Sequence, residues 1–440
     1  MARHLSPLDV SIEKALHPTD ENSNEEKKEL EVTEVVVSDE GGPPDGGSVA
    51  WLQVLGSFAL YFNHWGTINT FGVFQTYYEN ELLRHMSPSD ISWIGSTQSF
   101  LLLGVGVVSG PLYDAGFLRS LLVLGSFLMI LGMMLTSICT EYWQVMLAQG
   151  LCVGVGAGCL FVPSVAVIPE YFNKRKPLAM GVVTCGSSFG GVIYALMFQG
   201  LLSRVGFGWT TRIMGFTIFV TTAIPLLVLR RRTSASKVRS LIDASALREP
   251  PYIIYCLSLA LNNVAFFAPI FYLQSYSLLH GLEGQTVALY LVAILNAASV
   301  LGRLTPSLIA NRIGPVHTLF LSIFLTGITV LAWTNTTSGI GNILFAIAYG
   351  FFTGGIVALP AVVLTSFTTD LSRLGTRLGM SSMLNGGASL VGAPIAGKIL
   401  NATGSYLGVQ LFSGFLFIGT AMLVSMLRFA ITGKTFVVKA

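Results

Sequence analysis

The chain has 440 residues, of which 52% are hydrophobic and only 11% are charged. Soluble domains carry about 25% charged residues because their surfaces face water, so most of this surface must face lipid. The composition argues against a nucleic-acid-binding protein, a secreted disulfide scaffold and an ordinary cytosolic enzyme. The net charge of +3 has meaning only after the charges are placed along the chain.

The first segment, residues 1–49, contains twelve acidic and four basic residues and no aromatic ones. A segment of this composition cannot bury enough apolar surface to fold. It also lacks the basic and apolar regions of a cleavable signal peptide. We therefore expect a disordered acidic tail in the cytosol.

From Ala50 onward, apolar stretches of about 20 residues recur between short polar breaks, and each is long enough to cross a hydrocarbon core of about 30 Å. None alternates between polar and apolar residues as a barrel strand does, so they predict transmembrane helices. The twelve predicted spans are 51–76, 91–113, 117–138, 143–168, 178–203, 209–229, 251–276, 285–309, 316–334, 339–366, 378–401 and 406–428.

The basic residues of the loops predict the orientation. With the N-terminus inside, seventeen lysines and arginines fall on the inner side and four on the outer side. The positive-inside rule then predicts twelve spans with both termini in the cytosol, and we expect a multi-pass protein of the plasma membrane. The two glycosylation sequons, at Asn335 and Asn401, fall in predicted outer loops.

An internal repeat appears at an offset of 197 to 198 residues; it places Pro163 on Pro360 and Gly104 on Gly302. Two parallel six-helix halves would share a cavity at the midplane that rocking exposes to each side in turn, which favours transport by analogy of fold. The predicted domains are the tail (1–49), the N-terminal half (50–229), a basic cytosolic linker (230–249), the C-terminal half (250–430) and a cytosolic tail (431–440).

Three segments resemble known motifs. Residues 110–119 (GPLYDAGFLR) resemble the loop motif of the major facilitator superfamily. Residues 171–181 (YFNKRKPLAMG) and 45–51 (DGGSVAW) resemble the second and first signatures of the monocarboxylate porter family, in its fungal form. The resemblance implies an all-α, polytopic membrane protein with twelve transmembrane helices in two pseudo-symmetric six-helix halves, the major facilitator fold.

The same resemblance implies roles in gating for Asp114, Arg119, Lys174 and Arg175, with Asp114 contacting a neighbouring helix end. The alternative for Asp114 is a solvated loop acid. The basic residues lie just inside the membrane, where each gains about 1 kcal/mol from anionic lipid headgroups. Membrane lipids are therefore expected partners, and we expect no nucleic-acid partner.

Two departures from the animal members of that family concern the substrate site. Asn69 stands where those members carry a lysine in helix 1, and Ser299 stands where they carry an aspartate in helix 8, although Arg303 is kept. The proton-coupled mechanism of those members therefore does not transfer directly to this chain.

Arg303 is the basic residue placed deepest in a predicted span. A charge at such depth costs at least about 2.5 to 3.5 kcal/mol, so it must face a wet cavity or a partner. Asn296, Ser299 and Arg303 are spaced i, i+3 and i+7 on one helical face, and a guanidinium with polar neighbours suits a carboxylate or another planar anion. The alternative is that Arg303 snorkels to the cytosol or joins helices.

Other polar residues predicted at mid-depth are His64, Asn69, Asn262 and Asn385. We expect them to line the substrate site, and the alternative for His64 is a hydrogen-bonded packing residue. Outside the tail none of the ten acidic residues lies at mid-span. If transport is coupled to protons, the proton must then travel on His64 or on the substrate.

Several function classes are disfavoured by missing motifs. The chain has no phosphate-binding loop, no His-Glu-x-x-His pattern and no pair of buried acids, so we expect no catalytic residue, metal or cofactor. We expect a secondary active or facilitative transporter of a small organic anion or an amphipathic metabolite. The alternatives are an efflux pump for a fungal secondary metabolite, a non-transporting nutrient sensor whose tail is an output arm, and an intramembrane enzyme.

Overall fold

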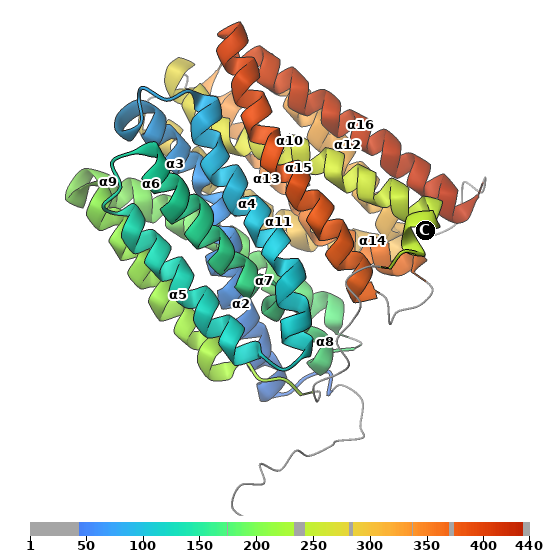
Figure 1. Cartoon of the computed structure of the whole chain (residues 1–440). Coiled ribbons are helices and arrows are strands. Elements are labelled where there is room, and N and C mark those ends of the chain that lie inside the picture. The colour runs from blue at the N-terminus through green and yellow to red at the C-terminus, as the bar shows by residue number, and fades with distance from the viewer. Residues whose placement is uncertain are drawn as a thin grey trace, which may run out of the picture. The chain divides into compact units, whose positions relative to one another are not determined.

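The computed structural model describes residues 44–173, 175–232, 243–280, 285–336, 338–368 and 374–433, and every regular element in these ranges is helical (Figure 1). The tail predicted for residues 1–49 lies outside the described residues up to position 43. The helices are α2 (Ser48–Asn69), α3 (Phe71–Tyr77), η1 (Tyr78–Leu82), α4 (Pro88–Asp114), α5 (Leu118–Thr136), α6 (Tyr142–Val145), η2 (Met146–Val153), α7 (Gly154–Ala166), α8 (Ile168–Tyr171), α9 (Lys176–Val228), η3 (Ala246–Arg248), α10 (Pro250–His280), α11 (Gln285–Ile313), α12 (Pro315–Trp333), α13 (Gly339–Ala358), α14 (Pro360–Phe367), α15 (Leu374–Thr403) and α16 (Tyr406–Thr432).

These elements form the twelve helices of the predicted fold. Among the described residues, nine helices are long and apolar enough to cross a membrane. One of them, Leu178–Val228, holds two helices, because Gly206 adopts φ 73° and reverses the chain between them. The bent pair α2–α3 and the helix α15 complete the twelve; both are rich in polar residues, which is why hydropathy alone does not select them.

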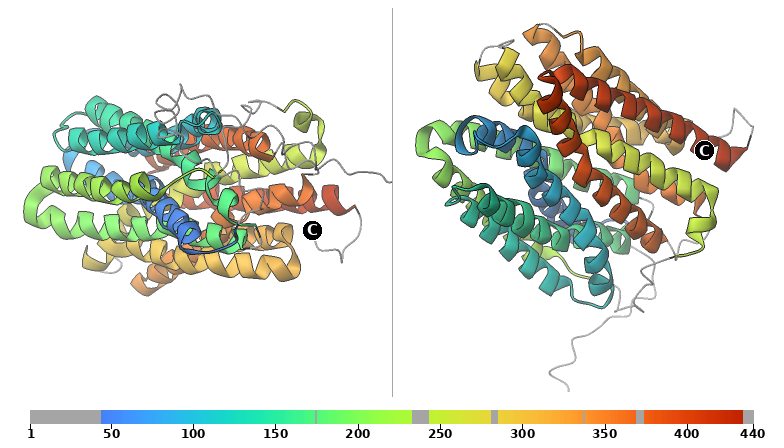
Figure 2. Two further views of the ribbon diagram at one scale, coloured as in Figure 1. Left: turned by 90° about the horizontal axis from the view of Figure 1, so that it is seen from below. Right: turned by 45° about the horizontal axis from the view of Figure 1, so that its top comes forward.

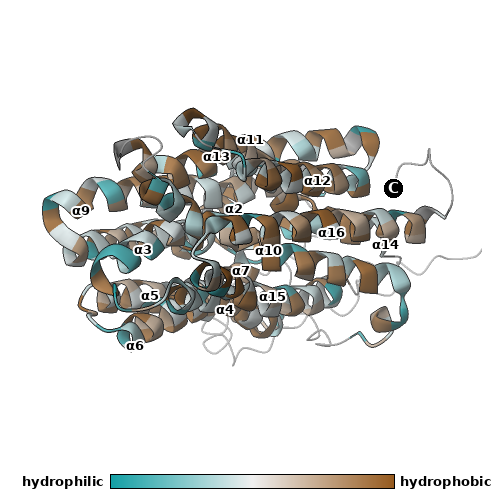
Figure 3. Cartoon of the chain, turned by 90° about the horizontal axis from the view of Figure 1, so that it is seen from above, coloured by the Kyte–Doolittle hydropathy of each residue, from teal (hydrophilic) through white to brown (hydrophobic). Residues whose placement is uncertain are grey.

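Large apolar side chains remain exposed along many helices, among them Leu227 at 76%, as lipid-facing residues are. Figure 3 shows hydrophilic residues gathered near α3, α6 and the turn of α9, whereas hydrophobic residues prevail along α12 and α16. This distribution matches a multi-pass membrane protein.

The helix ends form two opposite faces. At one of them, which we call the linker end, Tyr171 accepts a hydrogen bond from the N–H of Asp45 and donates one to the main-chain oxygen of Arg230. At the other, which we call the distal end, Gln75 of α3 donates to the main-chain oxygen of Pro88 at the start of α4 (3.1 Å).

Small residues allow pairs of helices within each half to pack backbone against backbone. A Cβ atom added at Gly190 of α9 would overlap the main-chain oxygen of Phe62 in α2, and one at Gly302 of α11 would overlap that of Phe351 in α13. Only glycine fits at such approaches, which explains part of the glycine-rich pattern of the sequence.

In the described part of the chain, the most extensive contacts between the two halves are those of α4 with α15, α9 with α11, and α3 with α10. In Figure 1 and in the right view of Figure 2, α4 and α15 run side by side. The α3–α10 contact is tight, since a Cβ atom added at Gly72 would overlap the main-chain oxygen of Ile270. The hydroxyl of Ser89 in α4 also donates to the main-chain oxygen of Pro394 in α15 (2.9 Å). The distal end is therefore packed shut between the halves.

The N-terminal end of the linker is bound to the N-terminal half. The Arg231 guanidinium donates through Nη1 to the main-chain oxygens of Tyr113 (2.6 Å) and Asp114 (3.2 Å). The N–H of Arg232 donates to Glu170 Oε2 (2.7 Å). Residues 233–242 lie outside the described residues.

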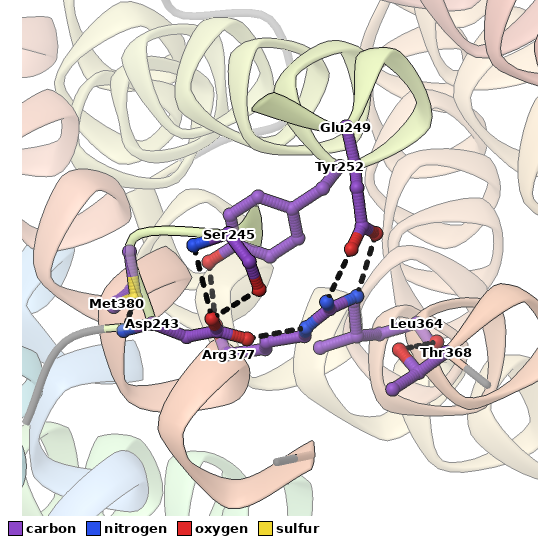
Figure 4. Close-up of polar contacts among 8 residues, drawn as sticks. All are labelled: Asp243, Ser245, Glu249, Tyr252, Leu364, Thr368, Arg377 and Met380. Carbon is purple, nitrogen blue, oxygen red and sulfur yellow. Dashed lines mark hydrogen bonds and ion pairs between the residues drawn. The ribbon is translucent and has the colours of Figure 1, made fainter. Parts of the chain in front are cut away.

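The other end of the linker is bound to the C-terminal half through Arg377 (Figure 4). Its guanidinium donates to both carboxylate oxygens of Glu249 (2.8 and 2.6 Å) and to Asp243 Oδ2 (3.1 Å). Tyr252 donates to the main-chain oxygen of Arg377 (2.8 Å), and its ring lies 5.8 Å from the guanidinium. Hydrogen bonds from Ser245 and from Arg377 hold the pKa of the Asp243 carboxyl below its ordinary value, although burial opposes them.

We expect Arg377→Ala to destabilise the purified protein by about 2 to 3 kcal/mol, because it leaves two carboxylates without their cation. The estimate is below that for a fully buried pair because the Glu249 side chain is 42% exposed. Thermal unfolding measures the loss, and Arg248→Ala, which removes an exposed arginine from the same segment, is the control. Because the Asp243 pKa is depressed, the stabilisation should persist from pH 8 to pH 5; equal unfolding midpoints for both variants would contradict the prediction.

Candidate functional site

Arg303 is almost completely buried, with 3% of its surface exposed, at the contact between α11 and α9. Its Nη1 donates to the main-chain oxygen of Thr184 in α9 (2.6 Å), and its Nε lies 3.5 Å from Ser299 Oγ. Among the described residues no acidic side chain pairs with it. A guanidinium has five N–H donors and no acceptor, so donors remain for a further partner.

The local packing of α11 explains why Arg303 faces the other half. Gly302 lies against the backbone of α13, within the C-terminal half. The next residue along an α-helix points about 100° away, which turns Arg303 from α13 toward α9. The arginine therefore joins the two halves, as one of the two alternatives from the sequence anticipated.

A second buried polar centre lies on α2, which packs against α9. His64 is fully buried, its Nε2 lies 3.3 Å from Ser164 Oγ of α7, and its Nδ1 has no hydrogen-bond partner among the described residues. The ring of Tyr61, one turn earlier on α2, is 4.8 Å from the His64 ring, and both side chains are buried.

The two neighbours predicted on α11 share the face of Arg303. Asn296 is buried against the backbone of Gly191 in α9 and donates to the main-chain oxygen of Val292 (2.9 Å). Ser299 is also buried and lies between Asn296 and the guanidinium along the helix. The polar stripe therefore faces the contact between the halves, as the spacing predicts.

Three other predicted site residues make no hydrogen bond to Arg303, Ser299, Asn296 or His64 among the described residues. Asn69 is buried on α2 beyond His64. Asn262 of α10 and Asn385 of α15 each have a side-chain oxygen without a hydrogen-bond partner among the described residues. Their unused acceptors can bind a polar substrate, so their assignment to the substrate site stays a prediction.

The residues predicted to gate the transporter lie at the linker end. Asp114 is buried and its main-chain oxygen accepts from Arg231, whereas Arg119 and Arg175 are exposed. Lys174 lies outside the described residues. The exposed sequon residues Asn335 and Asn401 lie at the distal end, so the opposite side of the membrane carries both predicted glycosylation sites.

The two segments that resemble the family signatures contact each other. Asp45, with φ 53°, accepts at Oδ1 from the N–H of Asn173 (2.5 Å) and of Arg175 (3.3 Å). Trp51 packs edge-on against Phe172 with ring centroids 5.5 Å apart. The segment before α2 therefore holds the loop between α8 and α9.

Sequence reasoning missed Tyr61, Ser164 and Glu79. Tyr61 carried a usable signal, since it lies three residues before His64 on the same helical face. The sequence contained no signal for Ser164, because only the packing of α7 on α2 brings its hydroxyl close to the imidazole of His64. Glu79 does not lie at mid-span, but it is partly buried at the distal contact between the halves, where it accepts a hydrogen bond from Ser275.

Comparisons with known proteins agree with this architecture. The family model of the Major Facilitator Superfamily matches residues 54–334. The chain is 43% identical over 372 residues to the MFS-type transporter dbaD of Emericella nidulans, covering 84% of each protein. It is 38% identical to the aspyridones efflux protein apdF of the same fungus, over 84% of this chain and 76% of that protein. The crystal structure of the fucose:proton symporter FucP of E. coli superimposes with a TM-score of 0.59 over 86% of this chain and 98% of that one, and at 18% identity this shows a shared fold.

Proposed function

The chain belongs to the major facilitator superfamily and is a multi-pass membrane transporter, and on this premise we propose that it exports a small organic anion or an amphipathic metabolite. Export is supported by the name of the relative apdF, an aspyridones efflux protein that shares 38% of its aligned residues with this chain. The anionic character of the proposed substrate is inferred from the buried cation Arg303. The finer assignment to the monocarboxylate porter family is part of this proposal, supported by the contact between the two signature-like segments at Asp45.

The observation that carries the proposal is the buried, acid-free environment of Arg303. An unpaired charge in a low-dielectric interior is costly, and a helix carbonyl such as that of Thr184 neutralises it only in part. A substrate carboxylate would supply the missing negative charge, and the planar guanidinium can bind it in bidentate fashion. Ser299, Asn296 and His64 would then provide polar contacts, with Asn69, Asn262 and Asn385 reaching the rest of the molecule.

Alternating access follows from the position of this group. Arg303 lies where α9 of one half meets α11 of the other, so a substrate bound there contacts both halves. Rocking of the halves would break the distal contacts and open the site to that side. We propose a gating role for Asp114, Arg119 and Arg175 at the linker end and, from the sequence motif alone, for Lys174.

The orientation in the membrane is also proposed. The excess of basic residues on the linker side supports an orientation with that side, the linker 230–249 and both tails in the cytosol. The distal end then faces outward, where Asn335 and Asn401 would be glycosylated. The proposed location is the plasma membrane, and the proposed domain boundaries are those derived from the repeat.

A comparison of metabolites inside and outside cells with and without the protein tests export. If the chain exports an acidic metabolite, that compound accumulates inside the cells that lack the protein and falls in the medium. Cells that express Arg303→Ala should behave as cells without the protein. Identical distributions of every detected metabolite in the presence and absence of the protein would contradict the proposal.

A further inference from the structure

A small polar network crosses between the halves at the distal end. Glu79 of η1 accepts at Oε2 from the hydroxyl of Ser275 in α10 (2.6 Å) and at Oε1 from the side-chain amide of Gln75 (2.7 Å). The hydroxyls of Thr76 and Ser275 lie 3.1 Å apart. Ser275 is thus the residue of the C-terminal half to which both Thr76 and Glu79 are joined.

The surroundings of this network are apolar and tightly packed. The rings of Phe71 and Phe271 lie 4.8 Å apart between α3 and α10, and both are fully buried. Tyr272 donates to the main-chain oxygens of Pro88 in α4 (3.2 Å) and Ala393 in α15 (3.3 Å). The closed distal contact therefore covers part of the Glu79 side chain and reduces its access to water.

No described cation pairs with Glu79. The titratable groups on the elements around it are Tyr272, Tyr276 and His280 of α10, Tyr406 of α16, Asp90 of α4, Lys398 of α15, His85 between η1 and α4, and Tyr77, Tyr78, Glu81 and Arg84 beside η1. Of these, Arg84 and Glu81 are exposed, and the His280 ring stacks on Tyr276 with centroids 4.3 Å apart. Glu79 lies beyond the predicted span 51–76, and burial raises the pKa of its carboxyl more than the bonds from Ser275 and Gln75 lower it.

We propose that Glu79 is a proton-binding site open to the distal medium, and that its protonation is coupled to closure of the contact between α3 and α10. When the halves separate, the Ser275 hydroxyl moves away and water reaches the carboxylate. When they close, the carboxyl loses water and gains no cation, so the protonated form is favoured. The Ser275 hydroxyl, which donates to the carboxylate, can then accept a hydrogen bond from the protonated carboxyl instead, because a hydroxyl group can do both.

The sign of the coupling follows from linkage. Because closure raises the pKa of Glu79, closure takes up a proton, and an acidic distal medium stabilises the closed contact. As pH rises through the pKa of the closed form, the population of the open form increases. The closed-to-open ratio changes at most about tenfold for each unit by which closure raises the pKa. This coupling acts on the distal contact between α3 and α10 and does not depend on which substrate is carried.

The test measures the distance between the halves at the distal end. Trp143 at the start of the helix run α6–α7 and Ile340 at the start of α13 are 61% and 73% exposed, and they belong to different halves. In a variant without the five native cysteines, spin labels at Trp143→Cys and Ile340→Cys report that distance by double electron–electron resonance in lipid nanodiscs. We expect the short-distance population to fall between pH 5 and pH 8.

Substitutions assign the response to Glu79. Glu79→Gln, which stays neutral, should keep the short distance at both pH values, whereas Glu81→Gln, which changes an exposed acid two residues away, should keep the parental response. His280→Gln and His85→Gln should also keep the parental response, which distinguishes Glu79 from the histidines at the distal end. Ser275→Ala removes a bond that lowers the pKa, so it should move the midpoint of the response to higher pH.

Three results would overturn the proposal. The first is a distance distribution that does not change between pH 5 and pH 8 in the parent protein. The second is a Glu79→Gln variant that responds to pH as the parent does. Loss of the response in His280→Gln alone would also assign the proton to the histidine and contradict the assignment to Glu79.

Discussion

Arg303→Ala lowers the initial rate of transport of an anionic substrate at least about 10- to 100-fold, while the protein still folds and reaches the membrane. Hydrogen bonds to charged groups contribute about 1.5 to 3 kcal/mol, and each 1.4 kcal/mol corresponds to a factor of ten. The fold should tolerate the change because the oxygen of Thr184, which loses a bond to Arg303, belongs to a helix interior where a main-chain donor serves it.

Arg312→Ala is the matched control, because Arg312 is an exposed arginine near the end of the same helix, α11. Its transport rate should equal that of the unchanged protein. Arg303→Lys should recover part of the rate, since an ammonium keeps the charge but loses the planar fork. If Arg303→Ala transports with unchanged kinetics, the substrate anion does not bind at this arginine.

Gly302→Ala should lower the thermal stability of the protein by an amount equivalent to about 1 to 3 kcal/mol. The added methyl group would overlap the main-chain oxygen of Phe351 in α13. Gly354, also in α13, lies close to the backbone of Gly302 as well. Since both neighbours are backbone, they cannot rotate away, and α11 and α13 must separate. Transport should fall as well, because Arg303 is the next residue on α11.

Gly200→Ala is the control for the intrinsic effect of alanine in a helix. Nothing lies within 4 Å of a Cβ atom placed at Gly200. Alanine should there raise stability by up to about 1 kcal/mol, because glycine is the poorer helix former. The unfolding midpoints of the two variants, measured by intrinsic fluorescence, should therefore move in opposite directions; a shift of both in the same direction would show that the α11–α13 contact relaxes freely.

The spans were predictable because lipid imposes a simple rule. A helix must satisfy its own main chain and present about 20 apolar residues, and the polar breaks mark its ends. The predicted span 117–138 corresponds to α5 (Leu118–Thr136), and 316–334 corresponds to α12 (Pro315–Trp333). The break at Thr70 between α2 and α3 was not predicted, because residues 51–76 read as one continuous apolar stretch.

The candidate site was predictable only where residues share one helix. Asn296, Ser299 and Arg303 follow from helical periodicity, and the structure places them on one buried face. Contacts between helices do not follow from spacing, so the bond from Arg303 to Thr184 and the proximity of His64 to Ser164 required the structure. Glu79 was not predicted as a site residue, because it lies outside mid-span. Its hydrogen bond to Ser275 of the opposite half could be seen only in the structure.

Reconstituted protein provides the sharpest test of export by alternating access through Arg303. Liposomes containing the purified protein are loaded with the acidic metabolite that accumulates in cells lacking it, and its release is followed over time. Release should exceed that from protein-free liposomes, saturate with concentration, and drop to the protein-free rate with Arg303→Ala but not with Arg312→Ala. Release that equals the protein-free rate for the unchanged protein, or that persists with Arg303→Ala, would contradict the proposed function.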